Sequence, residues 1–155
     1  MVQEDNELLV QDLSARLSYG VKGKCEIDAS YDTSFDTIFQ LHKFDAILEG
    51  IKEDLLFVVP LIEDKDEQEF ANEEVADGID ILEFKPYLRP MSSMTEKEKK
   101  EYHKTFRAEP YGSGIGCIYV ESAKSFDWLD KKMFDYRGLI PNGLALEAPE
   151  GMYNI

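Results

Sequence analysis

The spacing of leucines predicts an amphipathic helix near the start of the sequence. Leucines recur every four residues from Leu9 to Leu17, which places them on one face of a helix over residues 6–18. Asp5 or Asn6 is expected to cap this helix by accepting hydrogen bonds from the free N–H groups of its first turn. Gly20 is expected to end it, because glycine readily adopts the positive φ of a helix C-terminus.

Four stretches after the helix have the pattern of β-strands. They are residues 21–28, in which apolar and polar residues alternate, and residues 35–44, 55–59 and 79–85. The continuous apolar run Leu55–Val59 predicts a central strand buried on both faces, with Pro60 at its end or at a bulge. The acidic connector over residues 63–77 is expected to hold one helical turn. Short strands without helical crossovers predict a small antiparallel sheet or half-open barrel of about four or five strands.

Residues 81–102 form the joint between this sheet and the remainder of the chain. Pro86 is expected to end the fourth strand, because proline cannot donate a hydrogen bond to a sheet. Pro86 and Pro90 drive the residues before them towards extended geometry, so residues 86–91 are predicted to form an extended arm. The predicted structural hinge also includes the capping-box pair of the next helix, and comprises Pro86, Tyr87, Leu88, Arg89, Pro90, Thr95 and Glu98.

The pattern after this joint favours helices and loops. One helix is predicted from Thr95 to about Phe106, a strand at residues 117–121, and a second helix from its cap Ser125 to Phe134. The apolar tail that follows is expected to pack back on the domain. The predicted fold class is therefore α+β. A single domain is expected over residues 1–155, with an acidic helix-plus-sheet part (1–85) and a charge-balanced helical and loop part (86–155).

The net negative charge adds to this picture, because the whole excess of acidic residues lies in the first half of the chain. Residues 1–80 contain 21 Asp and Glu against 6 Lys and Arg, whereas residues 81–155 contain 11 of each kind. Such a field repels nucleic acid and anionic membranes and attracts basic surfaces. A basic protein partner is therefore expected, and the alternative is an acidic loop that only keeps the protein soluble. The predicted partner-binding residues are Glu63, Asp64, Asp66, Glu67, Glu69, Glu73, Glu74 and Asp77.

No metal site and no cofactor is predicted, because few residues have the spacing of ligands for either. Cys25 and Cys117 lie far apart, and neither His42 nor His103 belongs to a ligand motif. Asp64 begins an Asp-Lys-Asp run that lacks the glycine and the bidentate glutamate of a calcium loop. No apolar run approaches the roughly 20 residues of a membrane span, and the N-terminus lacks a signal-peptide pattern. A cytoplasmic location is expected.

Enzymatic activity is not predicted, although two groups of residues are candidates for a site. One comprises Tyr87, Arg89, Ser92 and Ser93 with His103 as the nearest base, and the other comprises Asp135, Tyr136 and Arg137. Anchoring, capping and local contacts of the tail account for both groups without any chemistry. The glycine-rich run at residues 110–116 precedes a predicted strand, whereas a phosphate-binding loop opens a helix. A turn is the better interpretation.

Three blocks of the sequence resemble recurrent segments in a family of small uncharacterised proteins from gut bacteria and their phages or prophages. They are DLSARLSYGVK (12–22), KPYLRPMSSMTE (85–96), and FDWL (126–129) running into FDYRGLI (134–140) and GLALEAPEGMY (143–153). Since that family has no assigned activity, the resemblance assigns no catalytic residue. It implies a mobile-element setting and a shared frame that carries a variable acidic middle region at about residues 26–80.

Three functional hypotheses follow. The first is a non-enzymatic interaction module that binds a basic partner, and the second is an inhibitor that imitates nucleic acid and blocks a host nucleic-acid enzyme or defence system. The third is an enzyme with an unrecognised site. Carboxylates dispersed between Glu49 and Asp80 would weaken the second hypothesis, because duplex DNA presents its charges in regular rows. A pocket that gathers Tyr87, Arg89 and His103 would favour the third.

Overall fold

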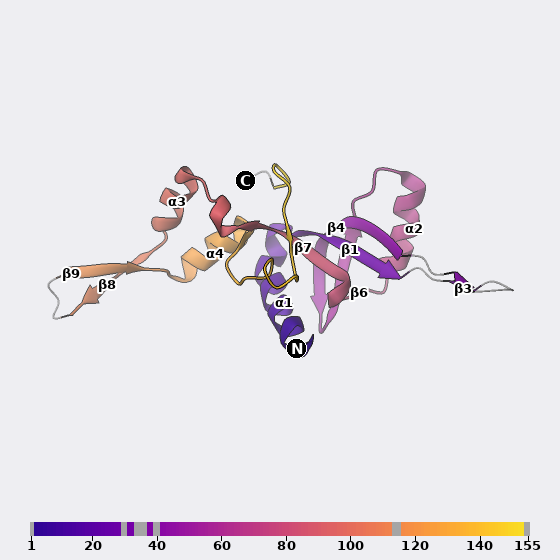
Figure 1. The fold of residues 1–155 in the computed structure, drawn as a ribbon, viewed down its shortest axis with the longest axis horizontal. Coiled ribbons are helices and arrows are strands. Elements are labelled where there is room, and N and C mark those ends of the chain that lie inside the picture. The colour runs from indigo at the N-terminus through magenta and orange to yellow at the C-terminus, as the bar shows by residue number, and fades with distance from the viewer. Residues whose placement is uncertain (1, 29–30, 33–36, 39–40, 113–115, 154–155) are drawn as a thin grey trace.

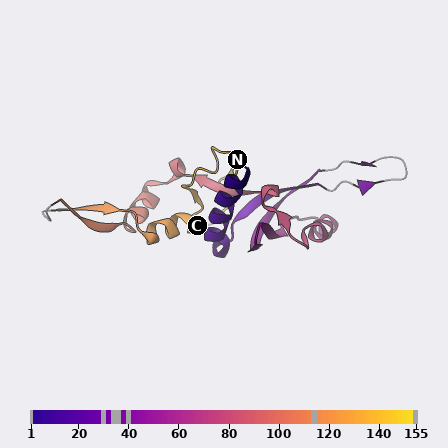
Figure 2. The ribbon, with the colours of Figure 1, turned by 90° about the horizontal axis from the view of Figure 1, so that it is seen from below.

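The computed structural model describes residues 2–28, 31–32, 37–38, 41–112 and 116–153. The molecule is elongated, with a central sheet and helix α1 between two different ends (Figure 1). Helix α2 (Lys65–Val75) lies towards one end, and the hairpin of β8 (Arg107–Tyr111) and β9 (Gly116–Val120) forms the other (Figures 1 and 2). The main sheet lies between these two ends (Figure 1).

Four α-helices, three 3-10 helices and eleven strands are assigned within the described residues. The other α-helices are α1 (Val2–Arg16), α3 (Glu96–His103) and α4 (Ala123–Lys131), and the 3-10 helices are η1 (Leu17–Tyr19), η2 (Ile81–Glu83) and η3 (Met91–Ser93). The other strands are β1 (Lys22–Asp28), β2 (Tyr31–Asp32), β3 (Thr37–Ile38), β4 (Leu41–Lys52), β5 (Leu55–Pro60), β6 (Ile79–Asp80), β7 (Phe84–Pro90), β10 (Phe134–Asp135) and β11 (Leu146–Glu147). The predicted α+β class is confirmed.

The main sheet is mixed, not purely antiparallel. Its described strands have the order β10-β7-β1-β4-β5-β6, and β11 also pairs with β7. The pairs from β7 to β6 are antiparallel, whereas β10 and β11 run parallel to β7. The predicted antiparallel sheet is therefore wrong in these two pairs. They form because the C-terminal tail returns to the sheet, which confirms that the tail packs back.

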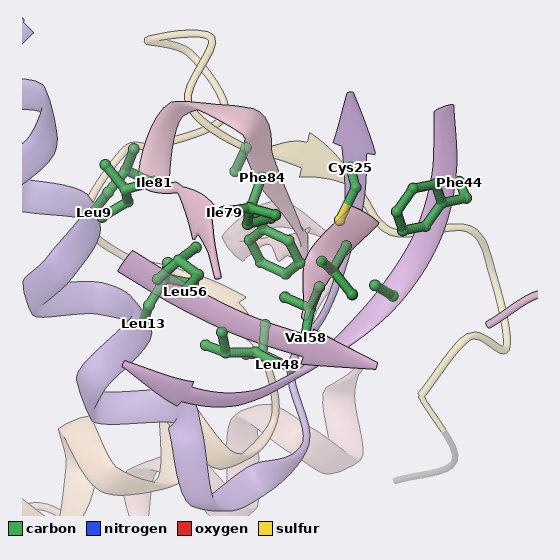
Figure 3. Packing of buried hydrophobic residues seen from close by; sticks show 14 of the residues in the cluster. Leu9, Leu13, Cys25, Phe44, Leu48, Leu56, Val58, Ile79, Ile81 and Phe84 are labelled. Carbon is green, nitrogen blue, oxygen red and sulfur yellow. The ribbon is translucent and has the colours of Figure 1, made fainter. Parts of the chain in front are cut away.

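Alternating residues of the strands form one buried face. Cys25 on β1 lies opposite Phe44 on β4 and Phe84 on β7, and all three are buried. Leu9 and Leu13 of α1 belong to the same apolar cluster as Ala71 and Val75 of α2. Figure 3 shows Leu9 and Leu13 directed from α1 towards the strand residues. This buried surface is the main core of the protein.

Strand β5 is covered on one face, which corrects the prediction of a strand buried on both faces. Leu56 and Val58 are buried, whereas Leu55 is 39% exposed. The run is continuously apolar, but only its inner side contributes to the core beneath α1 and α2. Pro60 ends the strand as expected. The single helical turn predicted in the acidic connector is instead the three turns of α2.

The prediction that Pro86 ends a strand is wrong. Residues 79–85 divide into β6, η2 and the start of β7, and β7 continues through Pro86 to Pro90. The extended geometry expected for this arm is correct, but the arm is a strand of the main sheet. Proline fits extended backbone and removes only one N–H group. The pairing of β7 also passes at this point from β1 to β10 and β11.

A second, smaller core lies beneath α3 and α4. It consists of Met94, Tyr102, Leu129 and Phe134. The capping box that begins α3 is confirmed, since the Glu98 N–H donates to Thr95 Oγ1 and the Thr95 N–H donates to Glu98 Oε1, both at 3.1 Å. The helix ends at His103, before Phe106.

The predicted bounds of the other helices also need correction. Helix α1 begins by Val2, so Asp5 and Asn6 lie inside it and do not cap it, whereas Gly20 ends η1 with a φ of 75° as expected. Helix α4 is capped by Ser122, and Ser125 is the third helical residue, whose hydroxyl accepts from the Ser122 N–H.

Of the predicted strand at residues 35–44, residues 37–38 form β3 and residues 41–44 begin β4. Residues 35, 36, 39 and 40 lie outside the described part of the chain.

Candidate functional site

Helix α2 places its apolar and acidic residues on opposite faces. Asp64 caps the helix by accepting the Glu67 N–H at 2.9 Å, and the predicted acidic connector thereby becomes a regular helix. Ala71 and Val75 face inward and are buried. Residues three, four and seven positions after Asp66 share its side of the helix, which places Glu69, Phe70 and Glu73 together on the outward face. We call Asp66, Glu69, Phe70 and Glu73 the α2 surface.

Phe70 is an exposed aromatic residue on this acidic surface. It is 52% exposed, although a phenylalanine ring contributes to stability mainly when it is buried. Its ring centroid lies 5.6 Å from that of His42, which in turn lies 4.9 Å from that of Phe44. His42 Nδ1 lies 3.2 Å from both carboxylate oxygens of Glu74. The Phe70 ring therefore rests against β4 while much of its surface faces solvent.

The predicted partner-binding residues do not all play the same part. Glu74 is half-buried against His42, and Asp64 serves as the helix cap. The remaining six are exposed: Glu63, Asp66, Glu67, Glu69, Glu73 and Asp77. The sequence identified the acidic residues, but it did not identify Phe70 as their exposed neighbour. The feature of the sequence that could have identified Phe70 is a phenylalanine at an outward-facing position of a polar helix.

The outer face of the sheet carries charges of both signs. Lys24 lies between Asp45 on β4 and Lys85 on β7, and Glu26 forms an ion pair with Lys43 at 3.7 Å. The carboxylates from Glu49 to Asp80 are also divided among β4, the β4–β5 turn, α2, the connections on either side of α2, and β6. Within the described strands, carboxylates therefore form no unbroken row such as imitation of nucleic acid requires.

Arg89 and Glu98, two of the predicted hinge residues, connect β7 to α3. The Arg89 guanidinium donates to both Glu98 carboxylate oxygens at 2.8 Å, and its Cζ lies 4.2 Å from the centroid of the Phe134 ring. The hydrogen bond from Arg89 lowers the pKa of Glu98 to about 2, against the opposing effect of burial. The paired and stacked guanidinium therefore links β7 to α3 and to β10.

The first candidate enzymatic group is not gathered into one pocket. The Tyr87 hydroxyl donates to Asp45 at 2.7 Å, and burial together with this bond raises the pKa of Tyr87 to about 12. Ser93 donates to the Pro90 carbonyl at 2.7 Å. His103 packs against the ring of Phe106 at a centroid distance of 5.2 Å. A hollow of about 660 Å³ beside Arg89 is lined by neither Tyr87 nor His103.

The second candidate enzymatic group takes part in a buried ionic cluster that the sequence did not predict. Asp12 and Arg16 are completely buried, and Arg16 donates to both Asp12 carboxylate oxygens at 3.0 Å. Arg137 donates to Asp12 at 2.7 Å and to Asp130 at 3.2 Å. Asp12 and Arg16 are four residues apart on α1, which was a visible signal of pairing. The cluster joins α1 to α4 and to the tail.

Asp135 and Tyr136 complete the contacts of this region. The Asp135 carboxylate accepts the N–H groups of Leu139 and Ile140, both at 2.9 Å, which fixes the turn after β10. Tyr136 donates to Asp130 at 2.9 Å, and burial followed by this bond raises the pKa of Tyr136. Each polar group has a structural partner, as expected for a contact of the tail.

The described residues contain no group of three or more His, Cys, Asp or Glu residues arranged to hold a metal ion. None of the helices resolved there has both the length and the apolar character that a membrane crossing requires. Cys25 and Cys117 are free thiols, and burial raises the pKa of Cys25 to about 12.

Comparison of the chain with protein-family models, curated proteins and solved structures finds no match in any of the three. No activity, ligand or partner can therefore be transferred to it from a known protein.

Proposed function

We propose that the protein is a non-enzymatic interaction module of mobile-element origin that binds a basic protein partner through the α2 surface. The observation that carries this proposal is the exposed ring of Phe70 among the exposed carboxylates of Asp66, Glu69 and Glu73. The contact with His42 accounts for only part of the Phe70 ring, because the side chain is still 52% exposed. An aromatic anchor within a charged rim is the usual composition of a protein-binding surface.

The two kinds of side chain have separate physical roles in this proposal. Complete burial of a phenylalanine side chain contributes about 1.5–3 kcal/mol, so Phe70 supplies affinity. The carboxylates accelerate the encounter with a basic surface and select against acidic partners. Since exposed charges are screened within roughly 10 Å at 0.1 M salt, binding should weaken as the salt concentration rises.

The remainder of the fold supports the proposal by holding α2 on a stable frame. The three blocks that resemble the mobile-element family meet in space: Tyr153 accepts the Lys22 N–H at 2.9 Å and donates to the Tyr87 carbonyl at 2.8 Å. Arg137 likewise contacts Asp12. The α2 surface lies outside these blocks, within the acidic middle region.

Quantitative capture from lysate of the producing cells tests this proposal. Immobilised wild type is compared with Phe70→Ala and with Glu69→Lys/Glu73→Lys, at low and high salt, and captured proteins are identified by mass spectrometry. The matched control is Glu4→Lys/Glu7→Lys, which makes the same charge change on exposed positions of α1. We expect a basic partner that wild type and the control capture at low salt. Both α2 variants should lose it.

The proposal is wrong if the α2 variants capture the same partners as wild type. It is also wrong if high salt leaves the captured amounts unchanged. Circular dichroism of each variant is the check that α2 and the sheet remain folded.

A further inference from the structure

An aromatic hollow lies at the end of the molecule opposite to α2. It has a volume of about 460 Å³ and is lined by His103 of α3, Phe106 and Tyr119 of β9. Ile118 and Tyr119 are 46% and 69% exposed, so the hairpin adds uncovered apolar surface beside the hollow. Such surface is unusual on a protein that has no partner at that place.

Exposed lysines lie on α3 and directly after it, close in sequence to the hollow. Lys100 lies three residues before His103 and shares its helix face, whereas Lys104 follows His103 at the end of the helix. Both lysines are exposed, as is Lys97 one turn before Lys100. Residues 96–104 hold four lysines and three glutamates, of which Glu98 is engaged by Arg89 and Glu96 by Lys99. The result is an aromatic recess near a helix with a small excess of positive charge.

The two ends of the molecule are therefore complementary. One end presents a phenyl ring between carboxylates three and four residues apart on α2. The other presents an aromatic recess near Lys97, Lys100 and Lys104, which lie three and four residues apart at α3 and its C-terminal end. We propose that the α2 surface of one copy docks on the recess of a second copy, with Phe70 against His103, Phe106 and Tyr119. This inference rests on the proposed function and identifies the basic surface that α2 binds as the α3 end of a second copy of the chain.

The position of the two surfaces determines the kind of assembly. Because α2 and α3 lie towards opposite ends of the molecule, the α2 surface of a chain cannot reach the recess of the same chain (Figures 1 and 2). Docking is then head-to-tail, and each added copy leaves one free surface of each kind. Head-to-tail contacts produce a ring if the rotation closes and a linear filament if it does not.

Sedimentation velocity at low salt tests the inference. Wild type should grow beyond the 17.8 kDa monomer as its concentration rises, and high salt should return it to the monomer. Glu69→Lys/Glu73→Lys and Lys100→Glu/Lys104→Glu should each remain monomeric. Phe70→Ala should weaken self-association by about tenfold to a hundredfold, because it removes the buried ring.

Charge exchange makes the test specific for these two surfaces. An equimolar mixture of the two charge-reversed variants should assemble, and so should a single chain that carries all four substitutions. The matched controls are Glu4→Lys/Glu7→Lys and Lys52→Glu/Lys85→Glu, which change the same charges at exposed positions elsewhere and should assemble like wild type.

Three outcomes overturn the inference: a wild type that stays monomeric at every concentration, assembly that survives both reversals, or a mixture that does not assemble. If wild type is monomeric but the α2 variants lose a basic partner in the capture experiment, only the self-docking inference fails. If the α2 variants also keep their partners, the proposed function fails with it.

Discussion

Gly23 shows how tightly β1 packs against β7. A Cβ atom added at Gly23 would lie 2.3 Å from Cζ of Phe84, at a position where Phe84 is completely buried. We predict that Gly23→Ala lowers the free energy of unfolding by about 1–3 kcal/mol, because the ring cannot move without disturbing the core. Urea denaturation measures the change.

Gly50→Ala is the matched control for this substitution. Its added Cβ would meet only ordinary contact with Phe57, at 3.7 Å. The expected effect is neutral or stabilising by up to about 1 kcal/mol, since alanine restricts the unfolded chain. Equal destabilisation by the two substitutions would contradict the packing described for Gly23.

The buried ionic cluster should respond strongly to the loss of one partner. Arg16→Met leaves Asp12 as a buried charge beside Arg137 alone, so we expect a loss of about 3–5 kcal/mol in the free energy of unfolding. Lys99→Met breaks the exposed Lys99–Glu96 pair and should cost less than about 0.5 kcal/mol. Thermal and urea denaturation of both variants test this contrast, and similar losses would refute it.

Residue roles were predictable where their partners are local in sequence. Thr95 with Glu98, and Gly20 at the end of its helix, were identified correctly because capping depends on residues within one turn. Arg16 lies one turn from its partner Asp12, a spacing that the sequence shows, but its burial depends on remote contacts such as the Phe134 carbonyl, 118 residues away. Periodicity predicts which residues face a core, but it does not predict a charged pair buried inside it.

At the scale of elements, the Arg89–Glu98 pair attaches α3 to the sheet. Because the pKa of Glu98 is lowered in the folded protein, the stability it contributes is fully present above pH 4.5 and is lost as the pH falls towards 2. We predict that Glu98→Gln lowers the free energy of unfolding at pH 7 by about 1.5–3 kcal/mol. The difference from wild type should shrink below pH 4.5, as urea midpoints measured from pH 2 to 7 would show. A difference that does not change with pH would contradict this role.

One hydroxyl group links the tail to both β1 and β7, in addition to the pairing of β11 with β7. Tyr153 accepts the Lys22 N–H and donates to the Tyr87 carbonyl, so Tyr153→Phe leaves two partly buried backbone groups without this partner. We predict a loss of about 1–3 kcal/mol and faster hydrogen exchange at residues 146–153. Exchange that stays as slow as in wild type would contradict a role of this hydroxyl in holding the tail.

The elements themselves were predictable to different degrees. Alternation identified β1 correctly, because one face of the sheet is covered and the other is wet. The prediction that the fourth strand ends at Pro86 was wrong, because the sequence does not show that this strand changes its pairing partners there. The parallel pairs that β10 and β11 form with β7 join residues far apart in the chain, and no local pattern specifies such contacts.

At the scale of the whole molecule, charge and apolar exposure vary along the long axis. The sequence predicted that the acidic excess belongs to the first half, and the fold places its α2 carboxylates towards one end of the molecule (Figure 1). It could not predict that His103, Phe106 and Tyr119 would meet at the other end, because Tyr119 reaches them only through the β8–β9 hairpin. The two ends, rather than the hinge between them, are where we place function.

Carboxylate footprinting tests the central claim, which is that the α2 surface is where a partner binds. Exposed carboxylates are labelled through carbodiimide activation, in the low-salt complex and in the free chain at high salt, and mass spectrometry compares their rates. We expect protection of Asp66, Glu69 and Glu73 in the complex, with unchanged labelling of Glu4 and Glu7 on α1. Equal labelling of α2 in both states, or protection confined to other elements, would contradict the claim.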